Sequence, residues 1–337
     1  MYRYIIRRLI AMPLLLLGIV SIAFLITHFT KGDPLISIIG ERQMDNPIVI
    51  AAAKARWGLD RSLPEQYLIY VGNLLTGDLG TSLRTKQGVG LDLLQRLPAT
   101  LELVVAAMLV GSLIGVTLGV AAAHYRDRAA DHFARLFALI GSSLPVFWSG
   151  LILLFIFWYT LGVLPGPGRL DTRSMAPPYV TGFYTIDSLV AGDLRIFAES
   201  ISHLILPACV LGWAVMGIIS RLVRASMLDV LNQDYILAAR AKGASEPRVL
   251  VNHALRNALI PTLTIVGFSF AYLITGAVLS EAIFSWPGMG SYAVDAARNL
   301  DYPAIMGVTI VGGAAFLLTN LVTDIAYAFV DPRIRFG

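Results

Sequence analysis

One polar stretch decides how the chain is interpreted: Asp234-Tyr-Ile-Leu-Ala-Ala-Arg-Ala-Lys-Gly-Ala-Ser-Glu-Pro-Arg-Val-Leu-Val-Asn-His-Ala-Leu-Arg-Asn-Ala-Leu-Ile-Pro261. It lies between two long apolar segments and carries Arg240, Lys242, Arg248 and Arg256. Because this charge is costly inside hydrocarbon, and because basic residues collect in the cytoplasmic loops of membrane proteins, we predict a cytoplasmic loop over about residues 225–258.

Local signals within this loop predict two short helices with a turn between them. Gly243 follows the first helix at the C-cap, where glycine suits a left-handed backbone. Ser245 can cap the second helix, with Glu246 and Pro247 in its first turn. A helix–glycine–helix element at a membrane surface suits docking onto another protein. The alternative is an ordinary basic loop.

The composition is typical of a polytopic membrane protein. The chain has 337 residues, of which 56% are hydrophobic and 14% charged, against about 25% charged in ordinary soluble domains. Mean hydropathy is +0.71. The net charge of +4 comes from loops, so we interpret it as a topology signal and predict no nucleic-acid binding. The single cysteine, Cys209, excludes an intramolecular disulfide.

Six apolar runs predict an all-α fold with six transmembrane helices. The first, Leu9–Phe29, follows Arg3, Arg7 and Arg8 and has about the 20 residues that a membrane span needs. No Ala-x-Ala cleavage site follows it, so we predict a retained span; a cleaved signal peptide is the alternative. The other runs are Leu101–Ala123, a third span that Arg135 helps to place and that runs to about Leu161, about Ser202 to Ser220, Leu259–Ile283 and Ala304–Tyr327.

The distribution of basic residues predicts that both termini are cytoplasmic. The proposed inside segments hold Arg3, Arg7, Arg8, Arg126, Arg128, Arg135, Arg221, Arg224, Arg240, Lys242, Arg248, Arg256, Arg333 and Arg335, whereas the two short outside loops hold only Arg169, Arg173, Arg195 and Arg298. The long segment after the first span is left out of this comparison, because loops beyond about 60 residues cross largely regardless of charge.

The polar segment at residues 30–98 predicts a small helical cap outside the membrane. Gly32-Asp33-Pro34 turns the chain at its start. Asn46 and Pro47 open one helix, which ends near Trp57-Gly58. Ser62 and Glu65 form a capping box for a second helix, which Gly77-Asp78-Leu79-Gly80 ends. The predicted domains are therefore an N-terminal segment with the first span (1–29), the cap (30–98) and a membrane domain with the other five spans (99–337).

Small and polar residues inside the spans mark packing surfaces and a candidate pathway. Gly111, Gly115 and Gly119 give one smooth helix face, which favours close packing within the subunit, with a subunit interface as the alternative. Polar or irregular positions that could line a water-filled route are Ser142, Ser143 and Pro145 in the third span and Ser269 and Thr275 in the fifth. Helix–helix hydrogen bonding is the alternative for each of them.

The sequence shows no enzyme chemistry. It has no Gly-x-x-x-x-Gly-Lys-Ser/Thr phosphate loop, and its five histidines lie in separate segments without His-Glu-x-x-His spacing. We therefore predict no catalytic, cofactor or metal site in this chain.

Few ionisable residues lie in the spans. Glu102, Glu281 and Asp324 lie near span ends, where interfacial solvation or helix capping explains them. Trp286, in the turn Phe284-Ser-Trp-Pro-Gly-Met-Gly290, is a candidate interfacial anchor. Because ion-coupled transporters need charged groups near the midplane, this scarcity disfavours the alternative function, a self-contained channel or secondary transporter.

The stretch that opens this section resembles a known family. Ala238-Ala239, three residues, then Gly243 resembles the Glu-Ala-Ala…Gly signature of permease subunits of bacterial ATP-binding-cassette importers. The longer string Asp234-Tyr235…Ala238-Ala239-Arg240-Ala241-Lys242-Gly243…His253–Pro261 is similar to the dipeptide, oligopeptide and nickel branch. Leu237 replaces the signature glutamate, and Arg256 stands roughly where the wider family has proline. Gly32-Asp33-Pro34, Gly58-Leu59-Asp60, Asp301-Tyr302-Pro303 and the basic tail Asp331–Arg335 extend the resemblance along the chain.

The resemblance implies a non-catalytic permease subunit in the inner membrane of a bacterium, which forms half of a pathway for short peptides or a related solute such as a nickel chelate. It implies three kinds of partner: a second related permease subunit, two cytoplasmic ATPase subunits that bind ATP and Mg²⁺, and an extracytoplasmic solute-binding protein. The residues that would contact the ATPase are Ala238, Ala239, Arg240, Lys242, Gly243, Ala244, Ser245 and Arg248.

Overall fold

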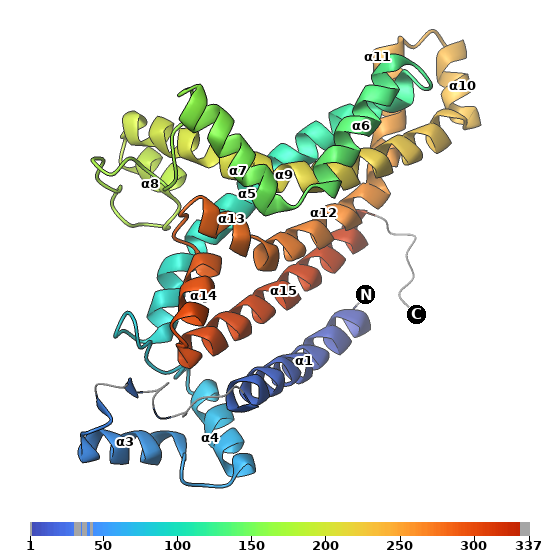
Figure 1. Cartoon of the computed structure of the whole chain (residues 1–337). Coiled ribbons are helices and arrows are strands. Elements are labelled where there is room, and N and C mark those ends of the chain that lie inside the picture. Colours follow the sequence, from blue (N-terminus) through green and yellow to red (C-terminus); the bar gives the residue numbers. More distant parts are fainter. Residues whose placement is uncertain (1, 30–34, 36–38, 41–42, 331–337) are drawn as a thin grey trace.

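The computed structural model describes residues 2–29, 35, 39–40 and 43–330, and its regular structure there is helical (Figure 1). Five helices are long and apolar enough to cross a membrane, or six if a bent pair counts as one span, which confirms the predicted all-α membrane fold. The predicted turn Gly32-Asp33-Pro34 and the tail Asp331–Arg335 lie outside the described residues.

The helices are α1 (Tyr2–Phe29), α3 (Pro47–Trp57), α4 (Leu63–Leu75), α5 (Val89–His124), α6 (Ala129–Ser143), α7 (Val146–Leu153), α8 (Tyr184–Val190), α9 (Leu194–Leu231), α10 (Asp234–Ala241), α11 (Glu246–Arg248), α12 (Arg256–Gly276), α13 (Val278–Ile283), α14 (Met289–Arg298) and α15 (Tyr302–Val330).

The pair α5 and α9 forms the centre of the molecule. Both helices are longer than the apolar runs suggested, because polar turns continue each helix beyond its membrane segment. The start of α5 at Val89 means that the predicted domain boundary at residue 98 falls inside a continuous helix. The glycine stripe of α5 packs against α9: an added Cβ on Gly111 would lie 2.6 Å from the Gly212 carbonyl oxygen. These glycines therefore serve packing within the subunit, as the favoured interpretation predicted.

The third span is broken, as its serines and proline indicated. Helices α6 and α7 meet at an angle of 107° across Leu144 and Pro145. Pro145 is the N-cap residue of α7, and a π-helical stretch, Leu154–Thr160, continues α7. The fifth span is also divided, into α12 and the short α13, which Ala277 joins.

The turn after α13 differs from its prediction. Phe284 and Trp286 are 2% and 1% exposed, so neither is an interfacial anchor. The Trp286 indole N–H donates to the Ala99 carbonyl at 2.8 Å, and both side chains belong to the protein interior. A buried indole needs such a hydrogen-bond partner, which α5 supplies.

The cap consists of α3 and α4, with the helix boundaries that the sequence signals predicted. Asn46 accepts hydrogen bonds from the backbone of Ile48 and Val49, and Gly58 ends α3 at φ +63°. The Glu65 carboxylate accepts from the Ser62 backbone N–H at 3.1 Å. These local hydrogen bonds explain why this part of the fold was readable from short motifs.

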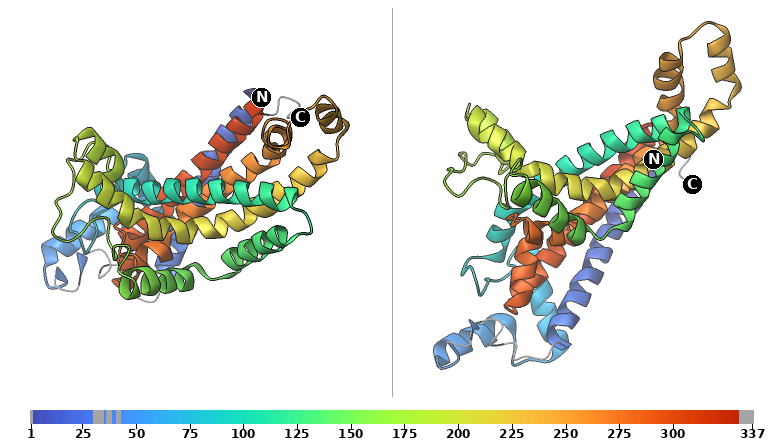
Figure 2. Two further views of the ribbon diagram at one scale, coloured as in Figure 1. Left: turned by 90° about the horizontal axis from the view of Figure 1, so that it is seen from above. Right: turned by 45° about the horizontal axis from the view of Figure 1, so that its top comes forward.

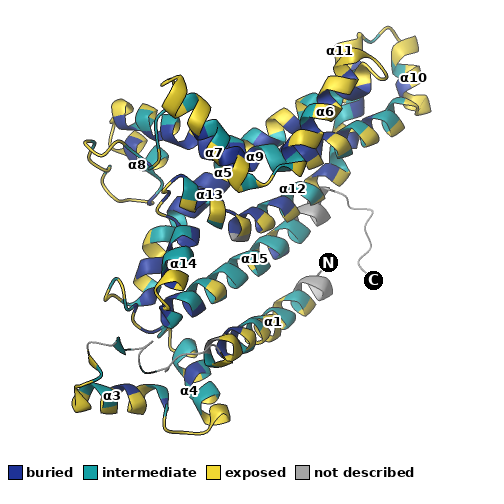
Figure 3. Ribbon diagram, viewed as in Figure 1, coloured by how far each residue is buried: buried dark blue, intermediate teal, exposed yellow. Residues whose placement is uncertain are grey.

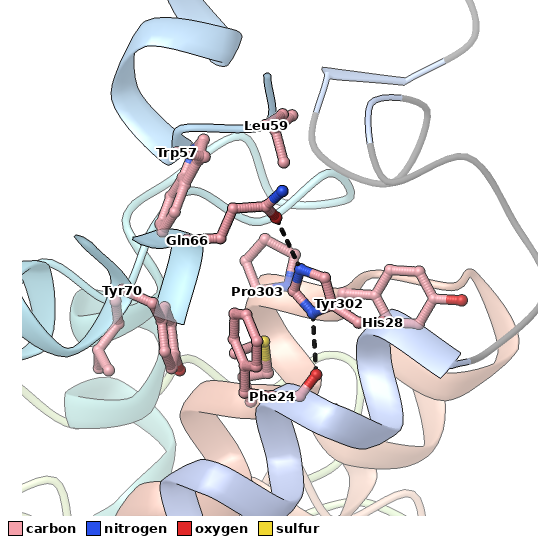
Figure 4. A pocket seen from close by; sticks show the side chains of 10 residues that line it. Phe24, His28, Trp57, Leu59, Gln66, Tyr70, Tyr302 and Pro303 are labelled. Carbon is pink, nitrogen blue, oxygen red and sulfur yellow. Dashed lines mark hydrogen bonds between the residues drawn. The ribbon is translucent and has the colours of Figure 1, made fainter. Parts of the chain in front are cut away.

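Aromatic side chains hold the cap against α1 and α15 around a small pocket (Figure 4). His28 of α1 lies 3.1 Å from the Gln66 side-chain oxygen of α4, and its ring stacks on Phe24. Ser21 and Tyr67 share a hydrogen bond of 2.7 Å. Side-chain contacts therefore hold the cap against the first span, in addition to the covalent connection along the backbone.

The fold has two distinct ends. The cap and α8 lie toward one end, whereas the start of α1, the end of α15 and the projecting α10–α11 element lie toward the other (Figures 1 and 2). Exposed residues cover much of α1, α7 and the α10–α11 element (Figure 3), and many of those on the spans are large and apolar, such as Leu14, Leu113 and Phe268.

Candidate functional site

Most of the polar stretch Asp234–Pro261 forms a projecting corner, which we call the α10–α11 corner and define as residues Asp234–Leu255. Helix α10 ends at Ala241, Lys242 is its C-cap, and Ser245 is the N-cap residue of α11. The second of the two predicted short helices is not separate. Helix α11 passes through a π-helical stretch, Val249–Leu255, directly into α12, the fifth span.

Gly243 has the predicted left-handed backbone, with φ +82°. Its N–H donates to the Arg240 carbonyl at 2.9 Å, and the Ala244 N–H donates to the Ala239 carbonyl at 3.2 Å. An added Cβ at Gly243 would meet no atom within 4 Å. Glycine is therefore required by the backbone conformation and not by crowding. Ser245 has the extended backbone of an N-cap residue, but its side chain makes no capping hydrogen bond.

Buried side chains fix the corner to the membrane helices. Ile236 and Val249 are both 0% exposed and belong to the core cluster that includes Met227 of α9 and Ala258 of α12. Asn257 of α12 donates to the Tyr235 hydroxyl at 2.7 Å, which joins α10 to the fifth span. A displacement of the corner would therefore be transmitted to α9 and α12.

The outer side of the corner is polar and mainly basic. Arg240, Lys242, Gly243, Ser245 and Arg248 are exposed. Arg240 donates to the Glu246 carboxylate at 2.8 Å across the glycine turn. Of the other predicted contact residues, Ala238 is exposed and Ala239 and Ala244 are half-buried, so these eight residues lie together around one tip.

The predicted pathway residues differ from one another in burial and in the contacts that they make. Ser142 is half-buried and accepts from Arg221 at 2.9 Å, whereas Ser143 and Pro145 are exposed at the bend. Ser269 is 5% exposed inside the chain, which favours the helix-packing alternative for it. The side chain of Thr275 lies outside the described residues.

The sequence did not single out the contacts that brace this region. Asp131 of α6 is fully buried, and Arg224 of α9 donates to both of its carboxylate oxygens, at 2.8 and 2.7 Å. These residues are far apart in sequence, and no local motif pairs them. The Tyr235–Asn257 hydrogen bond was missed for the same reason.

Comparison with protein families gives two matches that together cover nearly the whole chain. Residues 115–336 match the family described as binding-protein-dependent transport system inner membrane component. Residues 1–104 match the corresponding N-terminal family. The chain belongs to this family.

Similar proteins match this inner membrane component over nearly its full length. It is 44% identical over 335 residues to a di/tripeptide transport system permease protein from Pseudomonas aeruginosa, covering 99% of each chain. It is 43% identical over 324 residues to a probable D,D-dipeptide transport system permease protein from Escherichia coli, covering 96% of this chain and 95% of that one. A methionine ABC transporter structure has a TM-score of 0.50 at 15% identity, covering 70% of this chain and 94% of that one, and shows a shared fold.

Membership of the family settles the class of protein. An inner membrane component of a binding-protein-dependent system is the non-catalytic, multi-pass part of a bacterial ABC importer. It acts in a complex with an ATPase and a binding protein. The alternative of a self-contained channel or secondary transporter is therefore excluded.

Proposed function

We propose that this inner membrane component imports short peptides as one half of a pathway completed by a second, related permease subunit. Relatives described as dipeptide and di/tripeptide permeases support this substrate class. Nickel chelates, glutathione and sugars are the alternatives. The test is to purify the complete complex with its solute-binding protein and to identify the bound ligand by mass spectrometry. A nickel chelate or a sugar as the only ligand would contradict the peptide assignment.

We further propose that the α10–α11 corner couples this import to ATP hydrolysis on two cytoplasmic ATPase subunits. The main supporting observation is that the tip of the corner is exposed and positively charged, whereas the part of the corner next to the membrane helices is buried between α9 and α12. The ATPase is soluble and the pathway is in the membrane, so force must pass through a polar element at the surface. The Arg240–Glu246 pair and the Tyr235–Asn257 hydrogen bond stiffen this element.

Substitution of Gly243 tests the coupling role. Gly243→Val places a β-branched residue at positive φ, where it is a steric outlier and where a left-handed backbone costs roughly 1–2 kcal/mol. We expect normal insertion and normal pairing with the second permease, but weaker ATPase retention on co-purification and a loss of uptake in vesicles.

Gly77→Val is the matched control, because Gly77 in the cap has φ +81° and equally open surroundings. It should keep the ATPase bound. Wild-type ATPase retention and uptake with Gly243→Val would overturn the coupling role, whereas loss in both variants would reveal a general folding defect.

The charge pair provides a second test of docking. Arg240→Glu should weaken ATPase binding, because it reverses the charge at the exposed tip and repels Glu246. The double variant Arg240→Glu, Glu246→Arg restores the pair within the corner. Binding that recovers in the double variant would assign Arg240 to the stiffness of the corner, and binding that stays weak would assign it to contact with the ATPase.

A further inference from the structure

Three potential metal ligands lie close together at the end of the molecule that carries α8. They lie where the loop that follows the π-helical stretch Leu154–Thr160 contacts α9. Glu199 and His203 lie one turn apart on α9, and Asp171 lies in the loop. One ligand atom from each residue falls within 4.8 Å of the others. This side-chain cluster, Asp171–Glu199–His203, plays no part in the α10–α11 corner at the opposite end.

His203 is the residue that makes this cluster more than an acidic patch. Its side chain is buried, with the residue 4% exposed. Its Nδ1 lies 3.1 Å from the Gly168 carbonyl oxygen, and because a carbonyl can only accept, Nδ1 carries the proton. In the neutral ring Nε2 is then an acceptor, and it has no hydrogen-bond partner among the described residues.

The Nε2 lone pair is directed at another acceptor. It lies 3.6 Å from a carboxylate oxygen of Asp171, and two acceptors facing each other stabilise neither group. A cation between them relieves this arrangement. Two ligands of a tetrahedral Zn²⁺ at about 2.0–2.1 Å from the metal lie about 3.4 Å apart, which is close to the observed separation.

The surroundings hold the ligands in the manner of a metal site. Metal-binding histidines donate their second ring N–H to a carbonyl or carboxylate, which fixes the ring. Here Gly168 is itself held in place, because its backbone N–H donates to the Phe284 carbonyl oxygen at 2.8 Å. Glu199 accepts from the Asp171 N–H at 2.7 Å and from the Ser174 hydroxyl at 2.8 Å. An ionised carboxylate has about four lone-pair sites, so Glu199 keeps capacity for a cation.

We propose that Asp171, Glu199 and His203 bind a divalent transition-metal cation, for which Zn²⁺ is the best fit. One imidazole and two carboxylates form a nitrogen–oxygen ligand set that suits Zn²⁺, whereas Mg²⁺ and Ca²⁺ prefer oxygen ligands alone. Three protein ligands leave a fourth position for water. Asp171 is mostly exposed, so the ion has an entry path from solvent. The bound ion would cross-link the loop at residues 168–174 to α9.

The competing explanation is an ion pair, in which a protonated His203 donates to Asp171 without any metal. Zinc binding to the intact purified complex separates the two. The complex is isolated with a histidine-free tag, treated with chelator, dialysed against Zn²⁺ and measured by elemental analysis. We expect Asp171→Asn and His203→Gln to bind one zinc fewer per chain than the wild type, or to bind it at least tenfold more weakly.

Two controls keep the result specific. Asp60→Asn, in the exposed turn of the cap, removes a carboxylate elsewhere and should leave the zinc content unchanged. Co²⁺ should give the visible absorption of a tetrahedral site in the wild type and lose it in Asp171→Asn, which tests the geometry without any transport assay. Equal zinc content and affinity in the wild type, Asp171→Asn and His203→Gln would overturn the metal site and favour the ion pair.

Discussion

Glu102 and Glu281 are carboxylates that the fold buries and surrounds with donors. They are 4% and 0% exposed, so interfacial solvation, one of the two explanations offered from the sequence, is wrong for both. Capping explains Glu281, which accepts from the Ser291 N–H at the start of α14. Glu102 accepts from the Thr185 N–H and hydroxyl and pairs with Arg169. Asp324 pairs with Arg8 and is partly exposed.

Arg169 provides the residue-scale prediction. Its guanidinium is buried between Glu102 and the Tyr184 ring, whose centroid lies 3.5 Å away. Breaking a buried ion pair by removing one partner costs about 3–5 kcal/mol, so Arg169→Met should clearly lower the melting temperature of the purified complex. Adding Glu102→Gln should recover much of that loss.

Arg173→Met in the same loop is the matched control, because Arg173 is exposed; it should melt like the wild type. If the Arg169→Met complex melted like the wild type, the ion pair would have no stabilising role.

What the sequence reveals at this scale depends on how local the interaction is. Gly243, Asn46 and Gly58 act through backbone groups a few residues away. The left-handed backbone of Gly243 and the start and end of the helix at Asn46 and Gly58 were predicted correctly. The Glu102–Arg169 pair joins residues 67 positions apart, and Arg169 was counted as an outside surface charge. The Asp171–Glu199–His203 cluster was missed for the same reason, because only the folded loop brings Asp171 to α9.

At the scale of elements, the contact between α5 and α9 depends on glycine. A Cβ added to Gly111 would lie 2.6 Å from the Gly212 carbonyl oxygen, and a Cβ added to Gly119 would lie 2.7 Å from the Val223 Cβ. Apolar runs and small-residue spacing sufficed to predict the spans and this packing. They did not predict the full helix lengths or the π-helical entry to α12, because polar helical turns outside the membrane carry no hydropathy signal.

Gly111→Ala should therefore push the two central helices apart. Overpacking a well-packed core costs typically about 1–3 kcal/mol, and here the obstacle is backbone, which cannot rotate away. We expect a lower melting temperature and a lower yield of assembled complex. Gly312→Ala is the matched control in α15, because its added Cβ meets nothing within 4 Å. Equal stability of both variants would mean that the helices separate without cost.

At the scale of the whole molecule, the arrangement of the two ends makes the predicted topology testable. The cap lies toward one end and the α10–α11 corner toward the other (Figure 1), so import by the proposed mechanism requires the corner to face the cytoplasm. In a Cys209→Ala background, we expect Asp60→Cys in the cap to react with an impermeant thiol reagent added outside intact cells. Ser245→Cys should react only after the membrane is opened. Both positions are exposed, and the Ser245 side chain makes no capping hydrogen bond that cysteine would remove. Ser62, by contrast, takes part in the cap of α4 and is a poorer site.

Full labelling of both variants in detergent controls for reactivity. Labelling of Ser245→Cys from outside would place the corner away from the ATPase, and no ATP-driven coupling through Gly243 could then operate.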